Sequence, residues 1–203
     1  MYITYFLLAV TVLVSLKGIN DPSFNRKLLL NPNDVIHYGK WYRVFTHGFV
    51  HANYIHLFFN MYVFYMFGVA LEGTFIASYG ARGYMLYPLL YLTAIMFAAL
   101  PALYKHKDNP GYNSLGASGA VSAILFAFIM LYPNVELELF FIPIEIPAYI
   151  FGPIILFLEY LMAKRGGTGI AHDAHLAGAI YGIIFIIALD YNFIFKFIDQ
   201  FGL

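Results

Sequence analysis

Six long apolar runs constrain this chain more than any other feature of its sequence. Each run approaches the ~20 residues that a helix needs to cross the hydrocarbon core of a bilayer. Hydrophobic residues make up 62% of the chain and charged residues only 11%, whereas a soluble domain carries roughly 25% charged residues. A soluble core of this size cannot bury so many apolar side chains. We therefore predict an all-α polytopic membrane protein with six transmembrane helices, at approximately 2–17, 54–71, 84–104, 115–132, 147–163 and 170–190.

The segments between these runs indicate one domain, 1–203. The long first loop, 18–53, is rich in aromatic residues and histidine, which favours a position in the membrane interface. A short segment at 135–146 lies between two prolines, and a glycine-rich connector at 164–169 precedes the last run. No internal repeat is evident. The first run lacks a basic flank and a small-residue cleavage site, so we expect a retained helix and not a signal peptide.

Charge and cysteine content exclude several functional classes. The formal net charge is zero, so the chain has no electrostatic footprint for nucleic acid. It contains no cysteine, which excludes a disulfide framework and a thiolate metal site. We expect no cofactor and no nucleic-acid partner, and the lipid bilayer is the surrounding medium.

Two polar residues stand within apolar sequence and form the candidate reactive pair. Ser118 lies in Gly116-Ala117-Ser118-Gly119, and His175 lies in Ala174-His175-Leu176-Ala177-Gly178. Buried polar groups in lipid usually pair with one another and usually mark function. Gly178 and Gly182 share the helix face of His175, so a second helix can approach closely there. The pair is a candidate nucleophile and general base, although the serine taken alone is more typical of ordinary helix packing.

The second apolar run supplies candidate hydrogen-bond donors. His56 and Asn60 are four residues apart and lie on one helix face. Donors aimed at a developing negative oxygen are the usual stabilisers of acyl transfer. The backbone amide of Ser118 is a third candidate, since amides in the first turn of a helix lack internal partners. The alternative interpretation is that His56 and Asn60 satisfy each other structurally.

The remaining polar residues leave other possibilities open. His172 is three residues before His175 and is the second candidate for the base. Asp173 points to another side of the helix, so no carboxylate is evident that supports His175. The histidines together could suggest a metal site, but no His-Glu-x-x-His pattern is present and we expect no metal. His47 is more simply explained as an interfacial residue.

Taken together, these motifs resemble the rhomboid family of intramembrane serine proteases. Gly116-Ala117-Ser118-Gly119 is similar to the family's Gly-x-Ser-Gly. The segment from Ala174 through Gly182 is similar to its Ala-His-x-x-Gly-x-x-x-Gly, and His56 with Asn60 to its His-x-x-x-Asn. The resemblance runs from about 40 to 190, with the motifs in the family's order. It implies a rhomboid-like bundle of six helices around a water-filled cavity.

The resemblance also implies a role for each matching residue. Ser118 would be the nucleophile and His175 the general base. His56, Asn60 and the Ser118 backbone amide would line the oxyanion hole. Many members carry a tyrosine against the catalytic histidine where this chain has Ser122, so the ring would be held differently, by a nearby aromatic residue for example. Supporting roles would fall to Gly116, Gly119, Gly178, Gly182, His51, Arg43 and Glu72.

The function implied is that of an intramembrane endopeptidase. Its partners would be single-span membrane proteins cut within their transmembrane segments. The fifth helix and the loop 164–171 would act as gate and cap over the site. One alternative is a catalytically inactive rhomboid-like protein that binds membrane helices. Another is a transporter or metal-handling membrane protein that uses the histidines.

Loop charges and the family resemblance disagree on orientation. The first, third and fifth loops hold most of the basic residues, namely Lys17, Arg26, Lys27, Lys40, Arg43, Lys105, Lys107, Lys164 and Arg165. The opposite side holds only Arg82 and Lys196. The positive-inside rule would place the first loop in the cytoplasm, whereas the family places it outside. We favour the family orientation, in a bacterial inner membrane with the site opening to the extracytoplasmic side.

Overall fold

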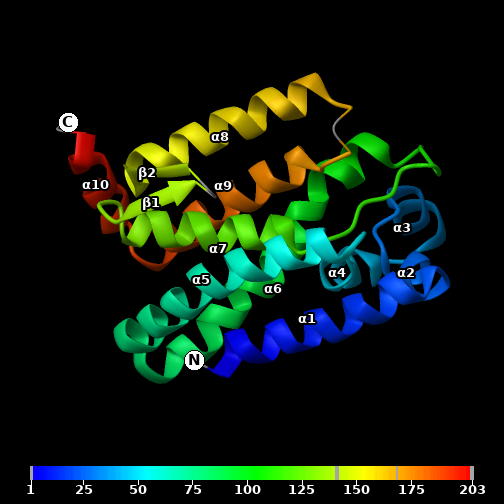
Figure 1. Ribbon diagram of the computed structural model, residues 1–203, viewed down its shortest axis with the longest axis horizontal. Helices are drawn as coiled ribbons and strands as arrows, with labels where there is room; N and C mark the ends of the chain where they lie inside the picture. The colour runs from blue at the N-terminus through cyan, green and yellow to red at the C-terminus, as the bar shows by residue number, and fades with distance from the viewer. Residues whose placement is uncertain (1, 140–141, 168, 202–203) are drawn as a thin grey trace.

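Long helices dominate the computed structural model, which describes residues 2–139, 142–167 and 169–201 (Figure 1). The long helices are α1 (Tyr2–Asn20), α5 (Tyr54–Tyr79), α6 (Gly83–His106), α7 (Ser118–Leu131), α8 (Ala148–Arg165) and α9 (His172–Leu189). Shorter elements are α2 (Pro22–Leu28), α3 (Pro32–Tyr38), α4 (Arg43–Thr46), α10 (Asn192–Ile198), η1 (His47–Phe49), η2 (Gly80–Arg82), η3 (Asp199–Phe201), β1 (Glu136–Leu139) and β2 (Ile142–Pro147). The expected all-α class with apolar helices is confirmed.

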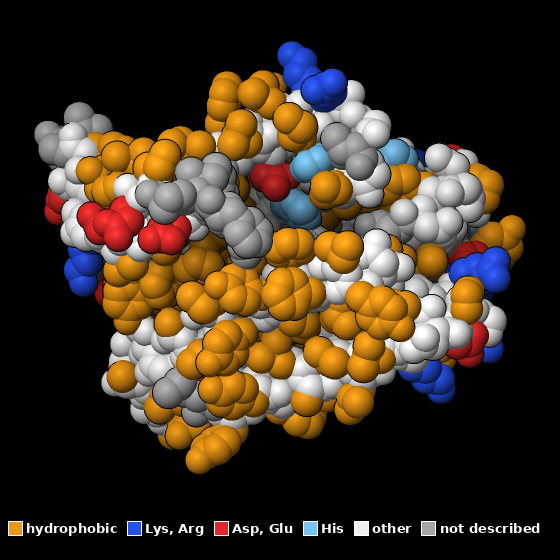
Figure 2. Space-filling model, viewed as in Figure 1, with side chains coloured by type: hydrophobic (Ala, Val, Ile, Leu, Met, Phe, Trp, Pro, Cys, Tyr) orange, Lys and Arg blue, Asp and Glu red, His pale blue; other side chains and the backbone are white. Residues whose placement is uncertain are grey.

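The surface has the character of a protein embedded in lipid. Large apolar side chains such as Phe6, Phe58, Met85 and Phe157 are more than half exposed, and a soluble monomer rarely leaves so much apolar surface in water. Figure 2 shows one face covered mainly by hydrophobic side chains, with charged groups mostly around its margin. Among the described residues, three segments are long and apolar enough to span, at Tyr2–Asn20, Tyr54–His106 and His172–Leu189. The middle segment contains both α5 and α6, and α7 is apolar but shorter, so the number six remains a prediction.

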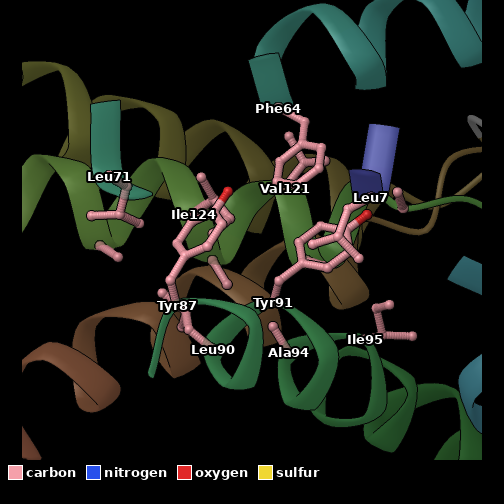
Figure 3. Packing of buried hydrophobic residues seen from close by; sticks show 14 of the residues in the cluster. Leu7, Phe64, Leu71, Tyr87, Leu90, Tyr91, Ala94, Ile95, Val121 and Ile124 are labelled. Carbon is pink, nitrogen blue, oxygen red and sulfur yellow. The ribbon is translucent and has the colours of Figure 1, made fainter. Parts of the chain in front are cut away.

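Helix α7 forms the centre of the bundle. It packs against α5, α6 and α9, and ten of its fourteen residues are buried. Figure 3 shows Val121 and Ile124 of α7 among large side chains of the neighbouring helices, including Phe64, Tyr87 and Tyr91. Burial of apolar surface against protein on all sides keeps α7, and the residue at its start, in a fixed position.

Glycines allow α7 and α9 to pack backbone against backbone. A Cβ atom built on Gly178 would lie 1.9 Å from the carbonyl oxygen of Gly119, and one on Gly182 would lie 2.2 Å from that of Ala123. Neither distance is possible for a real side chain. Gly119 is equally tight, since its Cβ would lie 2.3 Å from Cβ of Ala98. The two helices can approach this closely because these positions carry no side chain.

The first loop is largely helical and folded onto the bundle, not an irregular connector. Asp21 and Asn31 cap α2 and α3 by accepting backbone N–H bonds, and each is followed by proline at the first helical position. Gly39 ends α3 in the left-handed conformation, with φ of 67°. Leu30 pairs with Ser114 through two backbone hydrogen bonds of 2.9 Å. The first loop is therefore attached to the segment that leads into α7.

The structure differs from the expected elements at two places. The second run was expected to end at 71, with Glu72 at its end, but α5 continues to Tyr79. Gly73 is compatible with a helix interior here because a Cβ at that position would meet nothing within 4 Å. Segment 135–146 contains an antiparallel hairpin of β1 and β2, which we did not predict. Residues 140–141 of that segment and residue 168 of the expected cap lie outside the described residues.

Candidate active site

Ser118 and His175 lie within hydrogen-bond distance of each other. The distance from Ser118 Oγ to His175 Nε2 is 2.7 Å. Ser118 is the first residue of α7, and His175 is in the first turn of α9. The two side chains meet because the glycine contacts bring the helices together at this end. Their catalytic roles remain predictions.

A carboxylate that the sequence analysis missed lies on the other side of the imidazole. Glu159 of α8 places Oε1 3.1 Å from His175 Nδ1. The expectation that no carboxylate supports His175 is therefore wrong. Glu159 is half-buried, and an ionised group within a predicted span is a functional candidate by default. That signal could have singled it out, but only the fold shows which residue it meets.

The same carboxylate joins a second histidine. Glu159 Oε2 lies 2.6 Å from Nδ1 of His172, so each carboxylate oxygen faces one imidazole. The His172 and His175 rings are 5.9 Å apart between centroids and meet edge to face. The three ligand atoms all lie within 4.8 Å of one another. In Figure 2, histidine and acidic side chains gather in a hollow of a mostly hydrophobic face. Asp173 points away, as expected, and pairs with Lys105 at 2.8 Å.

The turn before Ser118 is fixed by the first loop. The Gly116 amide donates to the His47 carbonyl at 3.0 Å, and the Ala117 amide donates to His51 Nε2 at 3.3 Å. Because His51 accepts at Nε2, its proton sits on Nδ1, which faces Ser15 Oγ at 2.7 Å. Ser15 in turn donates to the Phe49 carbonyl at 2.9 Å. His51 thus supports the nucleophile turn from a distance, with help from a serine that the sequence analysis did not consider.

Burial keeps His47 and His51 of the first loop neutral. It lowers the pKa of His51 to about 3, and the neighbouring His56 acts in the same direction. Burial also lowers the pKa of His47 to about 4, against hydrogen bonds to backbone carbonyls that raise it. His47 was expected at the membrane interface. Its side chain is buried within the first loop, with Nδ1 3.1 Å from the Arg43 carbonyl. Its depth in the membrane stays a prediction.

His56 and Asn60 begin α5 next to the nucleophile turn. A Cβ on Gly116 would lie 2.9 Å from His56 Nε2, so the imidazole rests directly on this glycine. Gly116 has φ of 117°, which side-chain-bearing residues rarely adopt, and thus has two reasons to be glycine. Asn60 is buried, and its Nδ2 donates to the His56 carbonyl at 3.1 Å. That bond uses one of its two N–H groups and leaves the other as a donor.

Arg43 and Glu72 act at a distance from the reactive pair. Arg43 donates to the Arg26 and Leu29 carbonyls and pairs with Asp34 at 3.2 Å, which braces the first loop beside Leu30. Glu72 is fully buried and accepts from the backbone amides of Ile3 and Thr4 and from the Thr4 hydroxyl, at 2.7–3.1 Å. It ties the start of α1 to α5.

A family model described as the rhomboid domain matches residues 38–192. The chain belongs to the rhomboid family. It is 31% identical over 175 residues to the RHOMBOID-like protein 12, mitochondrial, of Arabidopsis thaliana, covering 79% of this chain and 51% of that protein. It is also 38% identical over 73 residues to an uncharacterized mitochondrial rhomboid protein of Schizosaccharomyces pombe, covering 34% of this chain and 18% of that protein. The chain thus spans about half the length of the first relative.

Membership in the rhomboid family supports a location in the membrane. Members of this family are typically serine proteases. Rhomboid proteins act on membrane proteins within the bilayer. Both relatives carry the word mitochondrial in their names, so the expected bacterial inner membrane has no support from them. We retain a membrane location without that compartment.

Proposed function

We propose that this rhomboid protein is an intramembrane serine endopeptidase. The observation that carries the proposal is the line of contacts from Glu159 through His175 to Ser118, at 3.1 Å and 2.7 Å. A nucleophile, a base and a group that orients the base are the parts needed to activate a serine. Family membership supports the same activity.

The geometry supports proton transfer from Ser118 to His175. With its proton on Nδ1 facing the carboxylate, neutral His175 has its Nε2 lone pair available to the Ser118 hydroxyl. As the serine oxygen attacks a peptide carbonyl, Nε2 takes up the hydroxyl proton and later gives it to the leaving amine. The Glu159 carboxylate holds the imidazole in this tautomer and stabilises the imidazolium that forms. Water then hydrolyses the acyl-enzyme, with His175 again acting as the base.

The oxyanion would be held by donors around the start of α7. The Ser118 amide is in the first turn, where backbone N–H groups have no partner within the helix. We propose that the His56 imidazole and the second N–H of Asn60 add to it. Each such donor is worth roughly 10²–10³ in rate in other acyl-transfer enzymes.

The proposed substrates are transmembrane segments of single-span proteins. A peptide bond inside an intact helix is shielded, so the substrate must unwind before the serine can reach it. Ser118 and the histidines lie at the end of the bundle covered by the first loop, because Gly116 and Ala117 bond to that loop. We therefore propose cleavage near the substrate end on the same side.

A fluorophosphonate probe tests the proposal. We expect it to label the purified protein in detergent, and not the Ser118→Ala or His175→Ala variants. Ser122→Ala, the same change one helical turn later, is the matched control and should label normally.

His56→Ala and Asn60→Ala should slow both labelling and cleavage of a single-span substrate, with the cut site mapped by mass spectrometry. An inactive helix binder or a transporter would leave the wild type unlabelled, and unchanged labelling of Ser118→Ala would refute the nucleophile.

A further inference from the structure

Glu159, His172 and His175 form a cluster with more ligand atoms than base orientation requires. Two imidazole Nδ1 atoms face the two oxygens of one carboxylate, at 2.6 Å and 3.1 Å. Orientation of His175 uses only one of those oxygens. Two histidines and one glutamate are a donor set that binds Zn²⁺ in sites that keep an open fourth position. From this arrangement we propose that the cluster is a zinc-binding site that switches the reactive pair off.

The spacing of the ligand atoms is close to what Zn²⁺ needs. Zinc binds imidazole nitrogen and carboxylate oxygen at roughly 2.0–2.2 Å, which places tetrahedral ligand atoms about 3.3 Å apart. The observed contacts of 2.6 Å and 3.1 Å must therefore open by less than about 1 Å. All three atoms already lie within 4.8 Å of one another. Small rotations of flexible side chains are sufficient to close the site around the ion.

Charge and access favour a cation at this position. The ionised Glu159 gives the cluster a net negative charge when both imidazoles are neutral. The side chains of Glu159, His172 and His175 are 24%, 10% and 17% exposed, so they are sheltered but not sealed. Histidine and acidic side chains line the hollow that Figure 2 shows. The proposed hydrolysis requires water to reach this hollow, and a dissolved ion can reach the three ligands by the same route.

The bound ion would affect Ser118 through the imidazole of His175. A neutral imidazole carries one ring proton, and a metal on Nδ1 leaves Nε2 as its only position. Nε2 then donates toward Ser118 Oγ and has no lone pair to take up the hydroxyl proton. Zinc also occupies the carboxylate oxygen that stabilises the imidazolium. The ion would therefore inhibit serine activation without covering the serine itself. This inhibitory step rests on the proposed function, whereas zinc binding does not.

The first test measures binding alone. The protein, purified in detergent without a polyhistidine tag, is equilibrated with ZnCl₂, and bound zinc is counted by elemental analysis. We expect one zinc ion per chain, and a tetrahedral Co²⁺ absorption band when CoCl₂ replaces ZnCl₂. Glu159→Gln and His172→Ala should weaken binding at least about 100-fold, since each removes a ligand. His37→Ala removes an exposed histidine outside the cluster and should bind zinc like the wild type.

The second test links binding to the serine. Micromolar Zn²⁺ should slow fluorophosphonate labelling of Ser118 at least about 10-fold, and EDTA should restore it. The same addition should not change the labelling rate of Glu159→Gln or His172→Ala relative to the same variant without zinc, with thermal unfolding used to verify that both variants are folded.

If the wild type binds no zinc, or if both variants bind zinc as well as the wild type, the site is refuted. Zinc bound at full stoichiometry with undiminished labelling would refute the switch. If the protein never labels, the proposed protease fails while the zinc count still decides the site.

Discussion

Glu159 changes the chemistry available to the serine–histidine pair. A lone imidazole is free to rotate and to exchange tautomers, so its basic nitrogen faces the serine only part of the time. The carboxylate 3.1 Å from Nδ1 favours the one tautomer in which Nε2 can accept a proton. Its burial is tolerable because each oxygen has a histidine partner.

At the residue scale, we predict that Glu159→Gln lowers kcat by about 10–100-fold with little change in KM. The loss is smaller than the ~10²–10⁴ expected for removing the base, because His175 itself remains. The measurement is steady-state cleavage of a single-span substrate, together with the unfolding temperature. Glu145→Gln on the exposed hairpin is the matched change and should have no effect. Equal kcat in Glu159→Gln and the wild type would contradict a positioning role.

At the element scale, the site depends on the distance between α7 and α9. Ser118 begins one helix and His175 lies in the first turn of the other, so any separation of the axes lengthens the 2.7 Å contact directly. Gly119 and Gly178 set that separation, since the carbonyl of one occupies the space of the other's missing side chain. Packing of small residues here is a condition for the chemistry as well as for stability.

We predict that Gly178→Ala destabilises the protein by about 1–3 kcal/mol, the usual effect of overpacking, and abolishes most labelling of Ser118. The added methyl group would have to displace the Gly119 carbonyl. Gly73→Ala on α5 is the control, because its Cβ meets nothing within 4 Å. That variant should gain up to about 1 kcal/mol from helix propensity and keep its labelling. Equal unfolding temperatures for the two variants would argue against close packing of α7 on α9.

At the scale of the whole molecule, the first loop is a folded segment that holds the turn before Ser118 in place. Its attachment uses the His47 carbonyl, the His51 imidazole and the pairing of Leu30 with Ser114. Both histidines are buried, and their pKa values are lowered to about 4 and about 3. These two histidines of the first loop therefore make the free energy of unfolding depend on pH.

We predict that stability falls as the pH drops below about 6.5, the usual pKa of histidine in an unfolded chain. Between that value and the lowered pKa, the unfolded state binds a proton that the folded state does not, so acid favours unfolding. Each histidine contributes up to about 1.4 kcal/mol per pH unit. Unfolding temperatures of the wild type, His47→Gln and His51→Gln between pH 7 and 4.5 test this. Each variant should show a shallower slope than the wild type, and slopes equal to that of the wild type would contradict the prediction.

The sequence by itself determined the membrane class, most helix positions and the residues that meet at the site. Apolar runs and small residues are local properties, and Ser118, His175, His56 and Asn60 stand out because polar groups are costly in lipid. Only the tertiary structure decided that Glu159 on α8 reaches both His172 and His175. It also decided that Ser15 and His51 support the turn before the nucleophile. Those contacts join residues far apart along the chain, and hydrophobic periodicity carries no information about which helix faces which.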